Sequence, residues 1–249
     1  MFKLDVIILS FILVFSFHAQ AANELPTVTD ILSIADGFRQ PSSSSRIKLD
    51  VSLFKGDQLN KQKSYTVYLK SGRRSLALFK SAGEQGQKAL QLKDRFYLLL
   101  PRSKRPVRIS PMQKLLGEAS IGDISTMTWS DDYDAEMADD NTNIDGVAAL
   151  KLKLKANHKG VTYDQIELWL TRNEFVPLQA NLYLKSGRIA KKINYKAGQM
   201  DGQKIITDMI IFDYIQMNQR TVVHYHRIEA FDVPDRYFNP AYLSRNDVE

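Results

Sequence analysis

The sequence predicts a mainly β protein in which a long antiparallel meander curls into a barrel or half-barrel. Three observations lead to this fold class. From Arg46 onward apolar residues recur at every second position, turn-forming residues separate the apolar runs, and only one segment has helical periodicity. A sheet whose strands each have one apolar face must hide that face, and few helices are available to cover it. The curled sheet therefore encloses an interior that is either filled by its own side chains or open to a small apolar ligand.

One short amphipathic helix is expected before the strands. Thr27 and Asp30 have the spacing of a capping box, in which an acidic residue follows a Thr after three positions. Gly37 is a natural stop signal. We expect a helix over 28–36 and a polar linker over 40–45. Its apolar residues recur at helical spacing and must lie on another element: Val28, Ile31, Leu32 and Ala35.

The first half of the chain then changes to a period of two. Alternating apolar residues predict strands over 46–54, 65–69, 76–78 and 96–100. Lys55-Gly56-Asp57 and Ser71-Gly72 supply turns between them. Pro101 and Pro106 interrupt the pattern, because proline cannot donate to a strand ladder.

The second half has clearer alternation and ends each run with turn residues. Asn157-His158-Lys159-Gly160 and Ser186-Gly187 are the plainest turns. On the first strand of this half, Lys151, Lys153 and Lys155 oppose the apolar face. Such a row solubilises the strand and guards against edge pairing, and contact with lipid head groups is the alternative. The predicted strands cover 148–156, 166–170, 178–184, 189–195, 205–214 and 221–231.

The first residues have the features of a cleavable signal peptide. Lys3 gives a positive start, residues 6–17 form an apolar run, and Ala19-Gln20-Ala21 matches the pattern that signal peptidase needs. The run is shorter than the roughly 20 apolar residues of a membrane span, so a retained anchor is the less favoured alternative. We expect residues 1–21 to be a signal peptide cleaved near Ala21. Residues 22–249 then form a single β domain, without internal repeats, in the periplasm.

Composition narrows the kinds of ligand and partner. The chain has no cysteine, which excludes disulfides, thiolate metal sites and a lipidated N-terminal cysteine. Lys and Arg number 34 against 28 Asp and Glu, a formal net charge of +6. A mildly basic exported protein can approach anionic lipids or an acidic partner. Nucleic acid is disfavoured because the destination lies outside the cytoplasm.

No local motif for catalysis or metal binding stands out. The sequence has no Gly-x-Ser-x-Gly elbow and no nucleotide-binding glycine loop, so we expect a protein that is not an enzyme and needs no cofactor. His224 and His226 share one face of a strand, but a third metal ligand is not evident. An acidic stretch lacks the spacing of a calcium loop and is interpreted as a solvated loop or an electrostatic face: Asp131, Asp132, Asp134, Glu136, Asp139 and Asp140.

Three segments carry a resemblance to a known family. The first, 101–133, reads PRSKRPVRISPMQKLLGEASIGDISTMTWSDDY and contains Arg108-Ile109-Ser110, the run 116–120 and Gly122-Asp123. The other two are YDQIELW at 163–169 and VPDRYFNPAYL at 233–243. In this order they resemble the LolA-like outer-membrane lipoprotein-sorting protein family, over most of the chain from about residue 90 onward.

The resemblance implies a strongly curved, half-open antiparallel β-barrel with a few short helices forming a lid over an apolar cavity. Known members receive acyl chains of lipoproteins and carry them across the periplasm, and relatives of this branch work beside membrane exporters. An inner-membrane exporter or an outer-membrane acceptor is therefore the expected partner. The chain is longer than the strict lipoprotein carrier, and that carrier's acceptor residues do not map onto it. Another lipid, or a lipid-linked substrate of an exporter, fits equally well.

Combining pattern and resemblance, we expect non-covalent binding of lipid or lipoprotein acyl chains, driven by burial of the chain. The lid would consist of helix 28–36 and the segment 111–117. The alternative is a non-transporting periplasmic scaffold or sensor with a filled interior. The candidate ligand contacts are Met112, Leu115 and Leu116, beside Pro111, in the lid, and Phe96, Leu98, Leu100, Leu152, Leu168 and Leu182 in the wall.

Overall fold

One large antiparallel sheet dominates the computed structural model, which describes residues 26–103, 105–125, 128–212 and 218–248. The sheet has 13 strands in the order β6-β5-β4-β3-β2-β1-β15-β14-β13-β12-β11-β10-β9. The predicted signal peptide and its cleavage near Ala21 lie outside the described residues. No helix in the described part of the chain is long and apolar enough to span a membrane.

The sheet consists of two meanders that meet at its centre. The first meander comprises β1 (Ser44–Lys55), β2 (Gln58–Lys70), β3 (Arg74–Phe79), β4 (Lys88–Leu92), β5 (Arg95–Leu99) and β6 (Val107–Ile109). The second comprises β9 (Tyr133–Ile144), β10 (Val147–Ala156), β11 (Gln165–Thr171), β12 (Pro177–Tyr183), β13 (Ile189–Met200), β14 (Gln203–Phe212) and β15 (Gln219–Ala230).

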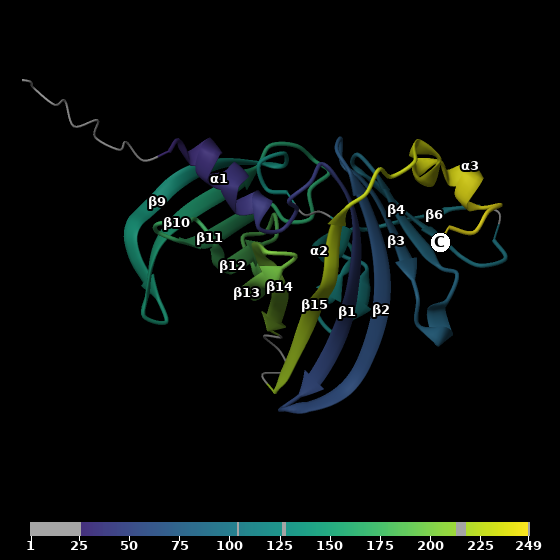
Figure 1. Ribbon diagram of the computed structural model, residues 1–249, viewed down its shortest axis with the longest axis horizontal. Coiled ribbons are helices and arrows are strands. Elements are labelled where there is room, and N and C mark those ends of the chain that lie inside the picture. Colours follow the sequence, from purple (N-terminus) through teal and green to yellow (C-terminus); the bar gives the residue numbers. More distant parts are fainter. Residues whose placement is uncertain (1–25, 104, 126–127, 213–217, 249) are drawn as a thin grey trace, which may run out of the picture.

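The two meanders are joined by the pairing of β1 with β15, in which Val51 lies opposite Val223. Figure 1 shows these central strands with β9–β14 curving away on one side and β3–β6 on the other. In the ladder of described residues, β6 and β9 are the two edges and do not pair with each other. The predicted mainly β, half-open barrel is therefore confirmed.

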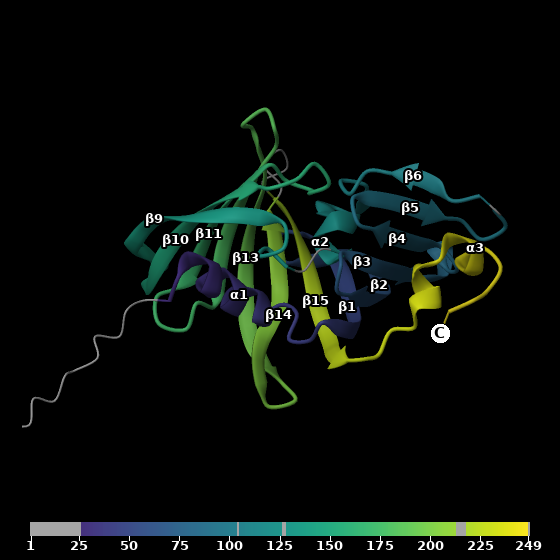
Figure 2. The same ribbon diagram turned by 90° about the horizontal axis from the view of Figure 1, so that it is seen from above.

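The concave side of the sheet, which we call the hollow, carries the main apolar core. Alternation creates it: on β1 the buried residues are Ile47, Leu49 and Val51, and on β13 they include Ile193 and Tyr195. Helix α1 (Val28–Gly37) lies across β9–β14 and adds Ile31, Leu32 and Ala35 to the same core (Figure 2). The predicted helix is confirmed, including the Thr27 hydroxyl that accepts a hydrogen bond from the Asp30 amide at 3.2 Å.

The convex side of the first meander carries a second apolar cluster, which the alternation pattern did not predict. Residues 65–69 of β2 and most of β3 and β4 are buried on both faces, because the C-terminal segment with the 3-10 turn Asp235–Phe238 and helix α3 (Pro240–Leu243) covers this part of the sheet. The Lys70 ammonium donates to the Val233 carbonyl at 2.8 Å. The Lys88 ammonium donates to the carbonyls of Leu243 and Asn246 at 3.1 and 3.0 Å. These two lysines tie the C-terminal cover to β2 and β4 through backbone carbonyl groups.

Asp134, Glu136, Asp139 and Asp140 lie on the edge strand β9, which corrects the interpretation as a loop for these four; their exposed surface agrees with an electrostatic face. Asp131 and the buried Asp132 precede the strand. Its acids lie opposite the lysine row of β10: Glu136 faces Lys153 and Asp134 faces Lys155. Opposite charges across an antiparallel pair stabilise it, and a charged edge resists pairing with other chains.

Candidate functional site

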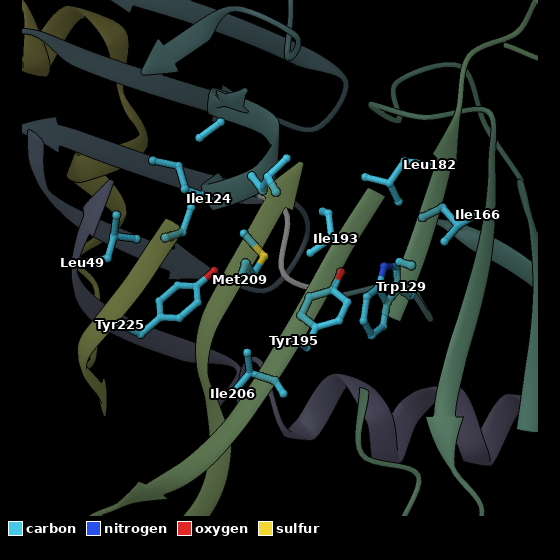
Figure 3. Packing of buried hydrophobic residues seen from close by; sticks show 14 of the residues in the cluster. Leu49, Ile124, Trp129, Ile166, Leu182, Ile193, Tyr195, Ile206, Met209 and Tyr225 are labelled. Carbon is cyan, nitrogen blue, oxygen red and sulfur yellow. The ribbon is translucent and has the colours of Figure 1, made fainter. Parts of the chain in front are cut away.

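A separate piece of chain fills the hollow. This plug comprises residues 110–125 and 128–132, which connect the two meanders. It contains β7 (Lys114–Leu116), β8 (Ala119–Ser120), which form a two-stranded sheet of their own, and α2 (Ile121–Ser125). Figure 3 shows two of its side chains, Ile124 and Trp129, among residues of the surrounding strands. The plug buries six apolar side chains in the main core: Leu115, Leu116, Ala119, Ile121, Ile124 and Trp129.

The structure brings eight of the nine predicted contact residues together. The core contains six of them, and the partly buried Leu98 and Met112 pack against it. Leu100 is 42 % exposed and belongs to neither cluster, so its assignment to the wall gains no support. The predicted lid segment 111–117 forms the first part of the plug, with Leu115 and Leu116 buried in the hollow and Gln113 and Lys114 exposed. The six core members are Phe96, Leu115, Leu116, Leu152, Leu168 and Leu182.

Helix α1 and the plug hold each other at one end of the hollow. The Asp36 carboxylate accepts hydrogen bonds from the amides of Trp129 and Ser130 at 2.6 and 2.8 Å, and from the Ser130 hydroxyl at 2.7 Å. The Arg39 guanidinium, also buried, stacks over Trp129 with its Cζ 4.1 Å from the ring centroid. Trp129 in turn meets Tyr195 edge to face. Burial raises the pKa of Asp36, more than its hydrogen bonds and Arg39 lower it.

A buried ion pair fastens α2 to the wall. Lys191 on β13 and Asp123 on α2 lie 2.5 Å apart, Nζ to Oδ2, and both side chains are 2 % exposed. The Tyr163 hydroxyl donates to Asp123 Oδ1 at 2.7 Å. The Ser120 amide and hydroxyl both donate to Oδ2 at 2.8 Å. Burial alone would raise the pKa of Asp123, but the Lys191 charge and these hydrogen bonds outweigh it, so the pKa is lowered and the carboxylate is ionised.

Little empty space remains between plug and wall. A cavity of about 40 Å³ lies next to the ion pair, which is room for one to a few water molecules and not for an acyl chain. Plug residues supply part of its lining. Strands of the second meander, the connection between β10 and β11, and Arg39 after α1 supply the rest. An acyl chain can therefore enter the hollow only if the plug moves out of it. The lining combines polar and apolar groups, among them Arg39, Asp123, Tyr163, Ile166, Leu182 and Ile193.

A polar clasp joins the two meanders across the open side. Arg73, in the turn between β2 and β3, places Nε 2.9 Å from the buried Asp132 carboxylate at the end of the plug. The same guanidinium donates to the Gly160 carbonyl at 3.2 Å, in the turn between β10 and β11. His158 in that turn lies 3.1 Å from Asp132. Side chains, and not strand pairing, therefore hold the two halves together here.

The histidine pair has a different setting from a metal site. His224 and His226 each face a carboxylate, Asp208 at 2.6 Å and Asp50 at 2.8 Å, on the convex face. Their rings meet edge to face at 4.7 Å. Within the described ranges no group of three or more His, Cys, Asp or Glu residues could hold a metal ion.

Pattern reasoning missed the polar residues of the site, although one of them left a signal. The alternation of β13 places Ile189, Lys191, Ile193 and Tyr195 on one face, so a lysine interrupts an apolar row. That interruption could have identified Lys191. Asp123 and Arg39 left no comparable signal, because the position of the plug depends on contacts far apart in sequence.

A glycine substitution tests how tightly the plug is seated. A Cβ on Gly122 would meet Thr162 Oγ1 at 2.5 Å and the Pro111 carbonyl oxygen at 3.1 Å. We expect Gly122→Ala to lower the free energy of unfolding by about 1–3 kcal/mol in urea denaturation, the usual cost of overpacking. Gly83→Ala is the matched control, since a Cβ there meets nothing within 4 Å. Equal midpoints for the two variants would show that α2 is loosely seated.

Comparison with known proteins agrees with this geometry. A family model described as "-like: Uncharacterized protein" matches residues 71–245, more than half of the chain. The chain belongs to this family. Among curated proteins, none matches the sequence.

The fold is that of the LolA superfamily. The LolA superfamily protein NE2245 from Nitrosomonas europaea is 27% identical, with a TM-score of 0.79 over 86% of this chain and 98% of that chain. A DUF1329 family protein from Desulfovibrio piger is 21% identical, with a TM-score of 0.70 over 86% of this chain and 97% of that one. A Vibrio parahaemolyticus domain named for outer membrane lipoprotein sorting is 18% identical, with a TM-score of 0.68 over 86% and 98%. The suspected resemblance is therefore confirmed at the level of fold.

Proposed function

We propose that the protein is a non-catalytic periplasmic carrier that binds lipid or lipoprotein acyl chains in the hollow and passes them between membrane partners. One observation carries the proposal: the apolar concave face is covered by a plug that is not a strand of the main sheet. The plug can leave without breaking a ladder of the 13-stranded sheet. The same side chains that now contact the plug would then contact the ligand.

The energies of plug and ligand are comparable. The plug buries five large apolar side chains, each worth about 1.5–3 kcal/mol, or about 8–15 kcal/mol together. An acyl chain of about 16 carbons, at about 0.8 kcal/mol per methylene, gains about 13 kcal/mol on burial. Replacing the plug with an acyl chain then changes the free energy of apolar burial little, as reversible binding of a carried ligand requires. Release follows when an acceptor binds the chain better than the hollow does.

Other observations support the carrier. The signal-peptide features predict export to the periplasm. The Vibrio domain of the same fold is named for lipoprotein sorting. An inner-membrane exporter would supply the ligand, or an outer-membrane protein would accept it.

Hydrogen exchange with and without ligand tests the carrier directly. The mature full-length chain would be titrated with a fluorescent 16-carbon acyl probe, and exchange would then be followed along the chain. We expect saturable binding and faster exchange of amides in 110–125 and 128–132, with β1, β13 and β15 still protected. Absence of binding, or binding with an unchanged plug, contradicts the proposal.

The filled interior favours a second candidate, a scaffold or sensor of an envelope complex. The cavity between plug and wall holds only about 40 Å³, because side chains of the chain itself occupy the apolar interior among the described residues. A scaffold would show no acyl binding in the titration and would leave the envelope as a complex with a membrane protein. Native mass spectrometry of the protein from its own envelope distinguishes the two, because a carrier leaves with lipid.

A further inference from the structure

The wall of the hollow contains a lysine where an apolar residue would be expected. Lys191 lies opposite Leu182 in the ladder between β12 and β13, and its ammonium is buried beneath the plug. Lysine is almost never fully buried unless it is paired. The group that pairs with Lys191 in the hollow therefore indicates which chemical group a ligand there must carry.

The charges of this pair belong to different parts of the molecule. The acceptor Asp123 and its hydrogen-bond donor Ser120 are both plug residues. The donors Lys191 and Tyr163 belong to the second meander and stay with the wall. Burial and the neighbouring Asp123 raise the pKa of Tyr163, so its hydroxyl keeps its proton and remains a donor.

Departure of the plug would leave these donors without an acceptor. A cation in an apolar wall without its anion is strongly unfavourable. The Arg39 guanidinium lines the same cavity and would lose its stacking partner Trp129 at the same time. Arg39 keeps the neighbouring Asp36 carboxylate, which loses its bonds to Trp129 and Ser130 at the same time. The uncompensated groups facing the vacated space are then the Lys191 ammonium and the Tyr163 hydroxyl.

We propose that the ligand is an acyl chain that ends in an acidic group, a carboxylate or a phosphate, which takes the place of the Asp123 carboxylate on Lys191 and Tyr163. This inference rests on the proposed carrier function and narrows its ligand class. The plug is then an internal substitute for the ligand: its apolar side chains occupy the place of the chain, and Asp123 occupies the place of the acidic group.

Paired ligands of equal chain length test the inference. Palmitate, methyl palmitate and a 16-carbon lysophosphatidic acid would be titrated below their aggregation concentrations against the mature full-length protein at pH 7.5. A charge-assisted hydrogen bond is worth about 10- to 100-fold in affinity. We expect palmitate or the lysophosphatidic acid, or both, to bind about 10- to 100-fold more tightly than the ester, and their ranking identifies carboxylate or phosphate.

Substitution of the lysine must remove that preference. Lys191→Met leaves Asp123 buried alone, so the double variant Asp123→Leu/Lys191→Met serves as the well-packed form. In both, we expect the ester still to bind and the acid-to-ester ratio to fall to about one. Lys192→Met is the matched control, since the neighbouring residue points to the opposite face of β13 and must keep the ratio.

The outcomes separate this inference from the proposed function. Equal affinity of acids and ester in the unmodified protein overturns the acidic-ligand assignment and leaves the carrier standing. A preference that survives in the double variant also overturns it. Failure of all three ligands to bind overturns the carrier and the assignment together.

Discussion

Asp123→Ala is expected to lower the free energy of unfolding by about 3–5 kcal/mol, the cost of leaving one member of a buried pair alone. Lys191 would lose its carboxylate partner in a site where its side chain is 2 % exposed. Ser120 and Tyr163 would lose their acceptor as well. Urea denaturation followed by tryptophan fluorescence measures the change, since Trp129 lies in the plug.

Two further variants serve as a control and a rescue for Asp123→Ala. Asp232→Ala removes a fully exposed carboxylate and should leave the urea midpoint unchanged. Asp123→Leu/Lys191→Met should recover most of the lost stability, because a packed apolar pair often replaces a buried ion pair without cost. A loss below about 1 kcal/mol for Asp123→Ala would mean that water reaches Lys191 and that the plug is not seated as described.

The pH dependence of the free energy of unfolding tests the buried ion pair independently. The pKa of Asp123 is lowered from its ordinary value of 3.8, so the folded state favours the ionised carboxylate. Its contribution to stability is complete above pH 3.8 and is lost as the pH falls through the lowered value. The stability curves of the unmodified protein and Asp123→Ala should therefore lie apart at neutral pH and converge in acid.

Most strands could be predicted from the sequence because one face of each is more exposed to solvent than the other. β1 and β10 to β15 alternate clearly, and their predicted bounds agree closely with those observed. β4 and β9 were missed for opposite reasons. β4 is buried on both faces beneath the C-terminal cover and shows no period of two. β9 alternates only over Tyr133, Ala135 and Met137 and is mostly exposed and polar beyond them, so its alternation is too short to stand out in the acidic stretch. The pairing of β1 with β15 joins distant segments and leaves no local pattern.

The site was predicted only in its apolar part. Leu152, Leu168 and Leu182 followed from alternation and lie in the hollow. The segment 111–117 shares the core with these leucines but lies next to β1 and β15, and the chain continues as a plug through Asp132. Periodicity could not decide whether the interior was filled, because that depends on where β7, β8 and α2 lie. The structure shows a filled interior, so any transport requires the plug to move.

A disulfide between the plug and the wall should abolish acyl-chain binding. A Cβ on Gly117 would lie 3.4 Å from Thr221 Cβ on β15, close to the range of about 3.5–4.5 Å between bridged cysteines. The chain has no cysteine of its own, so Gly117→Cys/Thr221→Cys can form only this bridge within one molecule. Gly117 has φ +53°, a conformation that costs another residue about 1–2 kcal/mol, and the bridge compensates for this loss.

The same protein before and after reduction is its own control. Each single-cysteine variant, treated with the same oxidant, should still bind the acyl probe. Gly117→Cys should bind it at least as tightly as the unmodified chain does, because its Cβ would meet Thr221 Oγ1 at 2.2 Å and loosen the plug. Any loss in the oxidised pair is then due to the bridge, which holds Leu115, Leu116 and Ala119 in the hollow on either side of residue 117.

The most direct test of the displaceable plug is the affinity of this double-cysteine protein for a 16-carbon acyl probe, measured oxidised and then reduced. The account predicts no measurable binding in the oxidised form and full recovery after reduction. Equal affinity in the two forms would contradict it, since the ligand would then bind while the plug still fills the hollow.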